Sequence, residues 1–343
     1  MVNLFTTDSY FNLFKILSTH LQENGLTLKG KNVVFCEAKI SLMLERAICE
    51  RIGGTFNTEV YSFGNFLRIN HPLDNVLSKE GSAMVVKRIL SGLNLKCYKN
   101  SKTTLAPALY NLLIQLKSAK ISVQDLINAQ ALAKGSLKNK LLDIIEIYNA
   151  YEEYLSVHNL LDQSSYIDKL SSVLKDSDKI KGANVYLVGY DGWTKQSRDA
   201  IESLIESAKS VTAILVEGDN PMMFVNETAK YIKSICAKKG ENLFYKNVKT
   251  EYLDEGRKIV DNLFCPSVMA TTKEKTDKIM FSPVENPYKE VQLVAENIKH
   301  LVIENKNRYK DFTIAISEPL KYKDIIEKVF DQLEIPYYID VKS

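Results

Sequence analysis

The ten residues 184–193, with the sequence NVYLVGYDGW, constrain the fold of this chain more than any other stretch. Their first half is rich in β-branched and aromatic residues, and the apolar run stops at Gly189. A short run of this kind is typical of a strand that is buried on both faces, as in a parallel sheet covered by helices. The stretch therefore predicts a central strand of an α/β domain.

Large polar and aromatic side chains follow that strand directly, namely Tyr190, Asp191 and Trp193. Open parallel sheets bind their ligands beyond the carboxyl ends of the strands, so this position is a candidate site. Tyr190 and Trp193 also have a second interpretation, in which both rings pack against the following helix. The residues alone leave both interpretations open.

Strand and helix signals alternate along the first part of the chain. Strands are predicted at residues 2–5, 32–35, 59–63, 184–188 and 211–216, and helices at residues 10–24 and 41–52. This alternation predicts a parallel sheet covered by helices. Between residues 66 and 181 strand signals nearly vanish and amphipathic helices recur, as in residues 106–117 and 137–155. We therefore expect residues 69–181 to be a helical insertion in a first domain made of residues 1–68 and 182–265.

A polar stretch at residues 266–277 is the best linker candidate, because it contains threonines and lysines but few large apolar residues. A second α/β unit is predicted over residues 278–343. Its strands are expected at residues 278–282, 312–316 and 337–339, and its helices at residues 288–304 and 322–333. The last strand comes too close to residue 343 for a sheet of usual size to close, so we expect the natural protein to be longer.

The composition is that of a soluble globular protein, with 45% hydrophobic residues, 25% charged residues and a formal net charge of +3. No run approaches the length of a membrane span and no secretory signal begins the chain, so a cytoplasmic location without a membrane partner is expected. The five cysteines are scattered, without the spacing of a zinc site or a disulfide framework. Because the net charge is small, any basic surface must be local.

The sequence contains none of the catalytic and cofactor motifs that such a sheet invites. The loop after the first predicted strand, residues 6–11, has no glycine and no lysine, and its Asp8 would repel a phosphate. No G-x-G-x-x-G follows a predicted strand, and no H-E-x-x-H occurs. We therefore expect no catalytic residue, no bound cofactor and no metal in this chain.

Five segments, taken in order, resemble stretches of one protein family. They are VFCEAKISLMLE at residues 34–45, VYSFGNFL at 60–67, VYLVGYDGW at 185–193, EVQLVAENIKHLVIENKNRY at 290–309, and the segment 311–340, which closes with IPYYID. The family is that of the B subunits of AddAB and RexAB helicase-nucleases. Each segment alone is a weak signal, but their common order makes the resemblance specific, and it covers nearly the whole chain.

The resemblance implies a region built like a superfamily 1 helicase that does not work as the motor. Its expected fold is α/β, with a RecA-like parallel sheet domain that carries a helical insertion, followed by the start of a second RecA-like domain. The implied partners are a motor and nuclease A subunit, in a heterodimer, and single-stranded and duplex-end DNA. The full-length subunit is expected to be an ATP-dependent exodeoxyribonuclease and helicase subunit. Its nuclease, iron-sulfur cluster and Mg²⁺ are expected in a C-terminal domain outside this chain, which is therefore predicted to be inactive alone.

In this family the B subunit scans single-stranded DNA for the recombination hotspot Chi, using loops at the strand ends of its first sheet. The matching positions here, joined by Trp193 from the end of the central strand, are Lys39, Ser41, Phe63, Asn65, Arg68 and Tyr190. Aromatic rings can stack on bases, cationic side chains can neutralise phosphates or read base edges, and hydroxyl and amide groups can hydrogen-bond. Family members often have a glutamine near Lys39, an arginine in place of Asn65 and a bulky aromatic in place of Arg68. The same hotspot sequence is therefore not implied.

Two other functions compete with DNA binding. One is a doubly wound nucleotide-dependent enzyme, which the glycine-free loop at residues 6–11 argues against. The other is a structural, partner-binding scaffold, in which the strand-end residues are packing. Salt-dependent binding of single-stranded DNA distinguishes DNA binding from the scaffold, and nucleotide titration distinguishes it from the enzyme.

Overall fold

The computed structural model describes residues 1–25, 30–55, 57–98, 104–217, 223–249 and 279–340. The chain divides into two compact units, residues 1–270 and 271–343. The predicted linker, residues 266–277, lies outside the described residues, so the domain boundaries expected from the sequence stay a prediction. None of the described helices combines the length and the apolar character that crossing a membrane requires.

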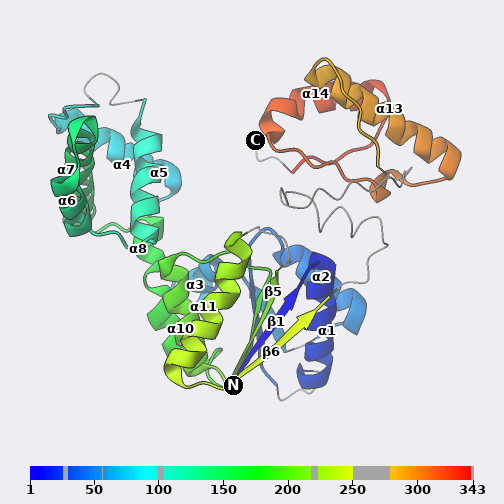
Figure 1. Cartoon of the computed structure of the whole chain (residues 1–343), viewed down its shortest axis with the longest axis horizontal. Coiled ribbons are helices and arrows are strands. Elements are labelled where there is room, and N and C mark those ends of the chain that lie inside the picture. Colours follow the sequence, from blue (N-terminus) through cyan, green and yellow to red (C-terminus); the bar gives the residue numbers. More distant parts are fainter. Residues whose placement is uncertain (26–29, 56, 99–103, 218–222, 250–278, 341–343) are drawn as a thin grey trace. The chain divides into compact units, whose positions relative to one another are not determined.

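The first unit is built on a six-stranded, wholly parallel sheet (Figure 1). Its strands are β1 (Val2–Thr7), β2 (Asn32–Cys36), β3 (Thr58–Tyr61), β4 (Asn184–Val188), β5 (Ser210–Val216) and β6 (Leu243–Val248). The order across the sheet is β3-β2-β4-β5-β1-β6, so β4 lies in the interior, between β2 and β5. The α/β class with a RecA-like parallel sheet is confirmed.

Two details of the sheet differ from the sequence prediction. The strand expected at residues 59–63 ends at Tyr61, because Ser62 already caps the next helix and Phe63 is its first residue. β6 was not predicted at all, because four of its six residues are exposed and the segment LFYKNV has no continuous apolar run. It is held by its parallel pairing with β1.

Helices cover both faces of the sheet. Helices α1 (Tyr10–Gly25) and α2 (Ser41–Ile52) supply buried leucines and isoleucines to one face. On the other face lie α9 (Leu170–Asp176), α10 (Lys195–Ser207) and α11 (Met223–Lys239). Successive strand residues point to opposite faces, and Val34 and Phe35 accordingly belong to different cores. Both residues are fully buried, so β2 is covered on both sides.

The chain between β3 and β4 is helical, as predicted, and most of it has a core of its own. Its helices before α9 are α3 (Phe63–Asn70), α4 (Lys79–Gly92), α5 (Ala106–Ser118), α6 (Val123–Leu132), α7 (Gly135–Val157) and α8 (Gln163–Ile167). Helix α3 packs into the sheet core through Phe66 and Leu67, whereas α4 to α7 enclose a separate core that includes Leu90 and Tyr151.

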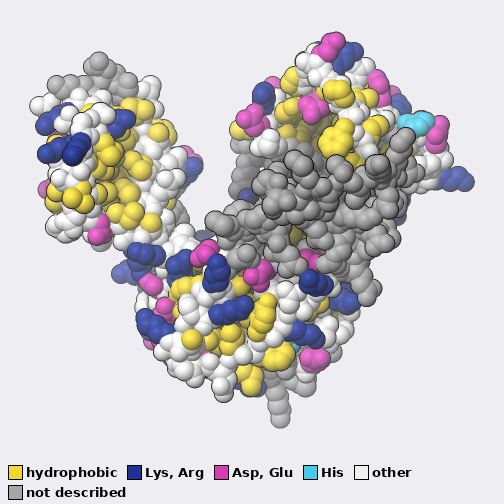
Figure 2. Space-filling view, viewed as in Figure 1, with side chains coloured by type: hydrophobic (Ala, Val, Ile, Leu, Met, Phe, Trp, Pro, Cys, Tyr) yellow, Lys and Arg dark blue, Asp and Glu magenta, His cyan; other side chains and the backbone are white. Residues whose placement is uncertain are grey.

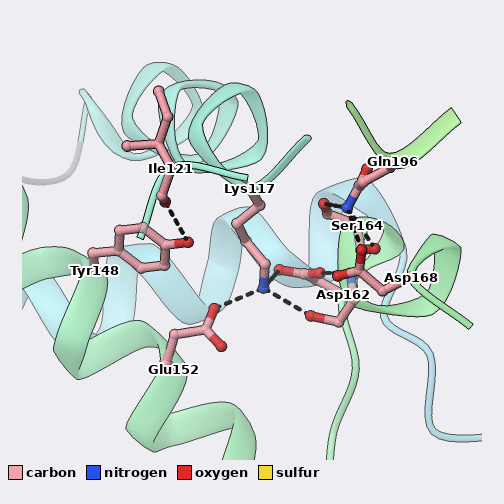
Figure 3. A network of polar contacts seen from close by, with 9 residues as sticks. Lys117, Ile121, Tyr148, Glu152, Asp162, Ser164, Asp168 and Gln196 are labelled. Atoms are coloured by element: carbon pink, nitrogen blue, oxygen red, sulfur yellow. Dashed lines mark hydrogen bonds and ion pairs between the residues drawn. The ribbon is translucent and has the colours of Figure 1, made fainter. Parts of the chain in front are cut away.

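A buried lysine links helices α5, α7 and α8 of the insertion (Figure 3). Lys117, near the end of α5, lies 2.6 Å from Glu152 Oε1 of α7 and 2.7 Å from Asp162 Oδ2, and it donates to Ser165 Oγ at 2.8 Å. The Asp162 side chain is fully buried and also accepts from the Ser165 backbone N–H, which makes it the N-cap of α8. Burial alone would lower the pKa of Lys117, but the two carboxylates outweigh it and raise that pKa.

The same network continues from α8 into the helix that follows β4. Gln196 of α10 donates from Nε2 to Ser164 Oγ at 2.8 Å and to Asp168 Oδ1 at 3.1 Å, as Figure 3 shows. Lys120, just after α5, forms an ion pair with Asp199 of α10. Helix α8 is therefore attached both to the insertion and to the sheet domain.

The second unit contains α13 (Pro287–Asn305), a 3-10 turn (Tyr309–Asp311) and α14 (Pro319–Gln332), packed around Ala295, Val329 and Phe330. The predicted helices at residues 288–304 and 322–333 are confirmed. The strands predicted at residues 312–316 and 337–339 are wrong, because neither segment pairs in a sheet within the described residues. Residue 278 lies outside those residues, and 279–282 form no strand. The start of a second RecA-like domain rests on the resemblance.

Candidate functional site

A cavity of about 690 Å³ opens beside the carboxyl ends of β2 and β3, among helices α2, α3 and α8. We call it the α3 groove. It is lined by Ala38, Ser41, Glu45, Val60, Ser62, Gly64, Asn65, Arg68, Pro72, Leu73, Val76, Gln163, Tyr166 and Ile167. Three of the residues predicted to contact DNA, Ser41, Asn65 and Arg68, are therefore brought together on one surface.

The local sequence explains how α3 presents its polar residues. The Ser62 side chain accepts from the Asn65 backbone N–H at 3.2 Å, which starts the helix immediately after β3. Asn65 and Arg68 then lie one turn apart on the same face, and Arg68 donates from Nη2 to Asn65 Oδ1 at 3.0 Å. The Asn65 amide thus orients an exposed guanidinium at the mouth of the groove.

The far wall of the groove comes from α8. Tyr166 donates its hydroxyl to the His71 carbonyl at 2.7 Å, and Gln163 donates to the Leu77 carbonyl at 2.8 Å. Burial raises the pKa of Tyr166, and the neighbouring Arg68 guanidinium opposes that rise. The positive charge of Arg68 therefore influences the ionisation of Tyr166, which also lines the groove.

The turn between β2 and α2 carries Lys39 and Ser41. Lys39 is exposed but does not line the groove, whereas Ser41 does, and its Oγ donates to the Ala38 carbonyl at 2.9 Å. Glu45, one turn along α2, also lines the groove and carries a charge opposite in sign to that of Arg68. The groove therefore offers hydrogen-bonding groups with one guanidinium rather than a strongly basic channel.

Charges of both signs are mixed on the surface of the first unit. On the face drawn in Figure 2, its lysine and arginine side chains are interspersed with acidic ones and form no continuous basic stripe. Among the described residues, no group of three or more His, Cys, Asp or Glu side chains could hold a metal ion. Any nucleic-acid contact on that face would depend on local features.

Aromatic rings gather at the ends of β2 and β4, and we call Phe35, Phe63, Tyr190 and Trp193 the aromatic stack. The rings of Phe63 and Tyr190 face each other, with centroids 5.5 Å apart and an interplanar angle of 19°. Phe35 supports Phe63 from below at 5.0 Å. However, Tyr190 is only 7% exposed, so its ring packs in the core, which is the second of the two interpretations that the sequence left open.

Trp193 also takes part in packing. Its ring lies 6.0 Å from Tyr190 and 6.1 Å, edge to face, from Tyr231 of α11, which in turn lies under the Arg198 guanidinium at 4.7 Å. The Tyr190 hydroxyl and the Trp193 Nε1 are buried without a hydrogen-bond partner among the described residues. Burial raises the pKa of Tyr190 well above its usual value. For Trp193, packing against the following helices is the arrangement observed.

The turn after β4 depends on Gly189, the residue at which the apolar run stops. Its φ is +71°, and a Cβ there would lie 3.0 Å from Ile40 Cδ1. Beyond it, Asp191 Oδ1 accepts from the Tyr10 hydroxyl at 2.8 Å, which joins the end of β4 to the start of α1. Burial and the Asp191 carboxylate raise the pKa of Tyr10 to about 12.

Sequence reasoning missed the residues that α8 brings to the groove, Gln163 and Tyr166. Helix α8 begins after the Asp162 cap, but no sequence signal shows that this helix faces α3. Lys39 and Trp193 were predicted as contacts and lie outside the groove lining. Whether any of the predicted residues binds DNA stays a prediction.

Comparison with known proteins gives consistent results over the first unit. A family model described as "ADDB, N-terminal" matches residues 39–251. Proteins named as the B subunit of an ATP-dependent helicase/deoxyribonuclease are similar over most of this chain. The protein from Clostridioides difficile (strain 630) is 26% identical over 81% of the chain, and that from Clostridium novyi (strain NT) is 24% identical over 91%. The one from Listeria monocytogenes serotype 4a (strain HCC23) is 25% identical over 85%. The chain spans only 26%, 30% and 27% of these three relatives.

Proposed function

This chain belongs to the family of AddB N-terminal regions, and on that premise we propose that it is a helicase-like, DNA-binding region of a helicase-nuclease B subunit. The relatives are named as the B subunit of an ATP-dependent helicase/deoxyribonuclease, which supports a role in a complex with an A subunit on DNA. In this proposal the chain contacts single-stranded DNA during recombinational repair and does not act as the motor.

The α3 groove is the observation that carries the proposal. It lies beyond the carboxyl ends of two parallel strands, where such sheets bind ligands. Arg68 is exposed, and Asn65 keeps its amide donors beside it. Arginine and asparagine are side chains that read base edges by paired hydrogen bonds. Sequence preference in the bound strand, as in hotspot scanning, would come from these groups rather than from a basic channel.

Binding of a fluorescein-labelled single-stranded 15-mer, followed by anisotropy at two salt concentrations, tests the proposal. Replacing Asn65 and Arg68 together by alanine should weaken binding by about thirtyfold or more, because each paired base contact contributes roughly 1–3 kcal/mol and two are lost. Lys138→Ala, an exposed lysine on α7, is the matched control for loss of one positive charge. Unchanged binding by the double variant would favour the partner-binding scaffold.

The same proposal excludes tight nucleotide binding at the start of α1. The loop at residues 6–11 has no glycine for close backbone approach. Ser9 Oγ accepts from the Phe11 backbone N–H at 3.2 Å, so that amide is already engaged. Calorimetric titration with Mg-ATP should show no micromolar affinity. A micromolar constant would instead support the nucleotide-dependent enzyme.

A further inference from the structure

A second groove lies at the opposite end of the strand order, on the side of the sheet that α1 covers. This cavity of about 690 Å³ runs between α1 and the edge strand β6, and we call it the α1–β6 groove. Among the side chains that line it are Phe11, Lys15, His20, Phe244 and Lys246. None of these belongs to the α3 groove or to the aromatic stack.

The groove presents aromatic rings to its surroundings. Phe11 is 65% exposed and Phe244 is 54% exposed, in contrast to the 7% of Tyr190. Phe244 is supported from beneath by Phe5, whose ring centroid lies 5.8 Å away, and the Arg51 guanidinium lies over Phe11 at 5.3 Å. Each ring is therefore held by a neighbour while much of its surface stays open. Two large exposed phenylalanines in one cavity favour a ligand with flat apolar faces.

The charges around these rings are mostly positive. Lys15 and Lys246 are both exposed, and neither forms an ion pair within the described residues. Glu23 is the acidic residue in the lining, and it lies 3.9 Å from His20. Burial and the neighbouring Lys246 lower the pKa of His20, while Glu23 opposes that shift. The groove thus combines free ammonium groups with stacking faces.

We propose that the α1–β6 groove binds a segment of single-stranded nucleic acid, with bases on Phe11 and Phe244 and phosphates near Lys15 and Lys246. Proteins that bind single-stranded nucleic acid without sequence preference generally combine aromatic and cationic side chains in one groove. An acidic peptide would satisfy the lysines but not the two open rings. The inference rests on the proposed function, that the chain meets single-stranded DNA, and adds a second contact on the other side of α1.

Photocrosslinking of the full chain to a 15-mer of 5-bromodeoxyuridine, with peptide mapping by mass spectrometry, tests the location directly. Crosslinks at Phe11 or Phe244 are expected. In parallel, anisotropy with a labelled oligothymidylate 15-mer should show about tenfold weaker binding for Phe11→Ala and for Phe244→Ala. Leu132→Ala removes an apolar side chain that is 85% exposed on α6 and should bind like the parent.

Replacing Lys15 and Lys246 by alanine should reduce the slope of log affinity against log salt by about 0.7 for each lysine, with Lys138→Ala as the charge control. Cooperative urea unfolding of every variant at the parent midpoint shows that the sheet is intact.

The outcomes separate the two grooves. Crosslinks confined to α3 groove residues, with parent-like binding by the Phe11 and Phe244 variants, would overturn this inference and leave the proposed function standing. Crosslinks confined to the α1–β6 groove would support the inference and contradict the role given to Arg68. A poly-glutamate peptide could instead displace the DNA strand from the protein. If the peptide then bound more weakly to the lysine variants but not to the phenylalanine variants, the partner of the groove would be an acidic protein segment. No binding of any strand by the parent would overturn both proposals.

Discussion

The α3 groove and the aromatic stack both lie at the carboxyl ends of the strands of the same sheet. They differ in how far neighbouring helices bury the side chains there. At the ends of β2 and β3 the chain turns into α3 through the Ser62 cap, and α8 faces it across an open cavity. At the end of β4 the rings of Tyr190 and Trp193 pack against Phe63 and α11. A residue at a strand end is therefore only a candidate contact, because its accessibility is decided by helices from elsewhere in the chain.

The two regions also treat their polar groups differently. In the groove, Arg68 and Ser41 bond to neighbours within one turn and stay accessible. In the stack, the Tyr190 hydroxyl and Trp193 Nε1 are buried without partners among the described residues. An unpartnered buried donor costs roughly 1–3 kcal/mol. In the proposed function the groove accommodates DNA, whereas the stack contributes apolar packing at some polar cost.

Truncating the stack should have the largest effect. Tyr190→Ala should lower the free energy of unfolding by about 3–5 kcal/mol, the range for removing a large buried aromatic side chain. Urea denaturation followed by circular dichroism measures this change. A loss below about 1 kcal/mol together with much weaker DNA binding would show that Tyr190 contacts DNA directly. The proposed difference between the stack and the groove would then be wrong.

The matched control for that variant is Tyr190→Phe. It keeps the ring and removes the unpartnered hydroxyl, so stability should stay the same or rise by up to about 1 kcal/mol. A clear loss of stability would instead show that the hydroxyl has a partner.

Removing the groove cation should come next. Arg68→Ala should weaken single-stranded DNA binding by about tenfold and flatten the salt dependence by about 0.7 in slope, because one positive contact is lost. Its unfolding free energy should change by less than about 0.5 kcal/mol, since the side chain is exposed. Lys138→Ala serves as control. If Arg68→Ala binds DNA with the parent affinity, then neither the groove nor the stack contacts DNA through the residues proposed here.

The N-cap of α3 should have a smaller effect that links the two regions. Ser62→Ala should cost about 1 kcal/mol in unfolding free energy, the usual effect of losing a cap, and should weaken DNA binding because α3 carries Asn65 and Arg68. Ser78→Ala removes the corresponding cap of α4, where the serine accepts from the Gly81 N–H at 3.0 Å. Equal stability losses with a binding loss only for Ser62→Ala would sharpen the comparison. Equal binding losses would contradict it.

The smallest effect concerns the hydrogen bond that anchors the turn after β4. The pKa of Tyr10 is raised to about 12 from an ordinary 10.0, by burial and by Asp191. Its stabilising contribution is therefore complete below pH 10 and is lost as pH rises toward 12. Tyr10→Phe should reduce the fall in the urea midpoint between pH 9 and about 11. Parallel curves for parent and variant would show that Asp191 does not hold this hydroxyl in solution.

The sequence by itself determined the parallel α/β core and several of its boundaries. The apolar runs of β1, β2, β4 and β5 and the helical periodicity of α1, α2, α13 and α14 are local patterns, and burial on a helix face or in a strand follows from them. Gly189 could be identified because a left-handed turn at φ +71° favours a residue without Cβ. Ser41, Asn65 and Arg68, which the resemblance placed at strand ends of the first sheet, line one groove, and their role in DNA binding stays a prediction.

Only the tertiary structure decided which side chains remain accessible to solvent. Tyr190 follows β4 and Phe11 lies in the first turn of α1, after β1, yet one ring is 7% exposed and the other 65%. The edge strand β6 exists because β1 pairs with it, and Gln163 and Tyr166 face the groove because α8 is attached at Lys117 and Gln196. Exposure and pairing depend on segments distant in the sequence, and no pattern within a short window carries that information.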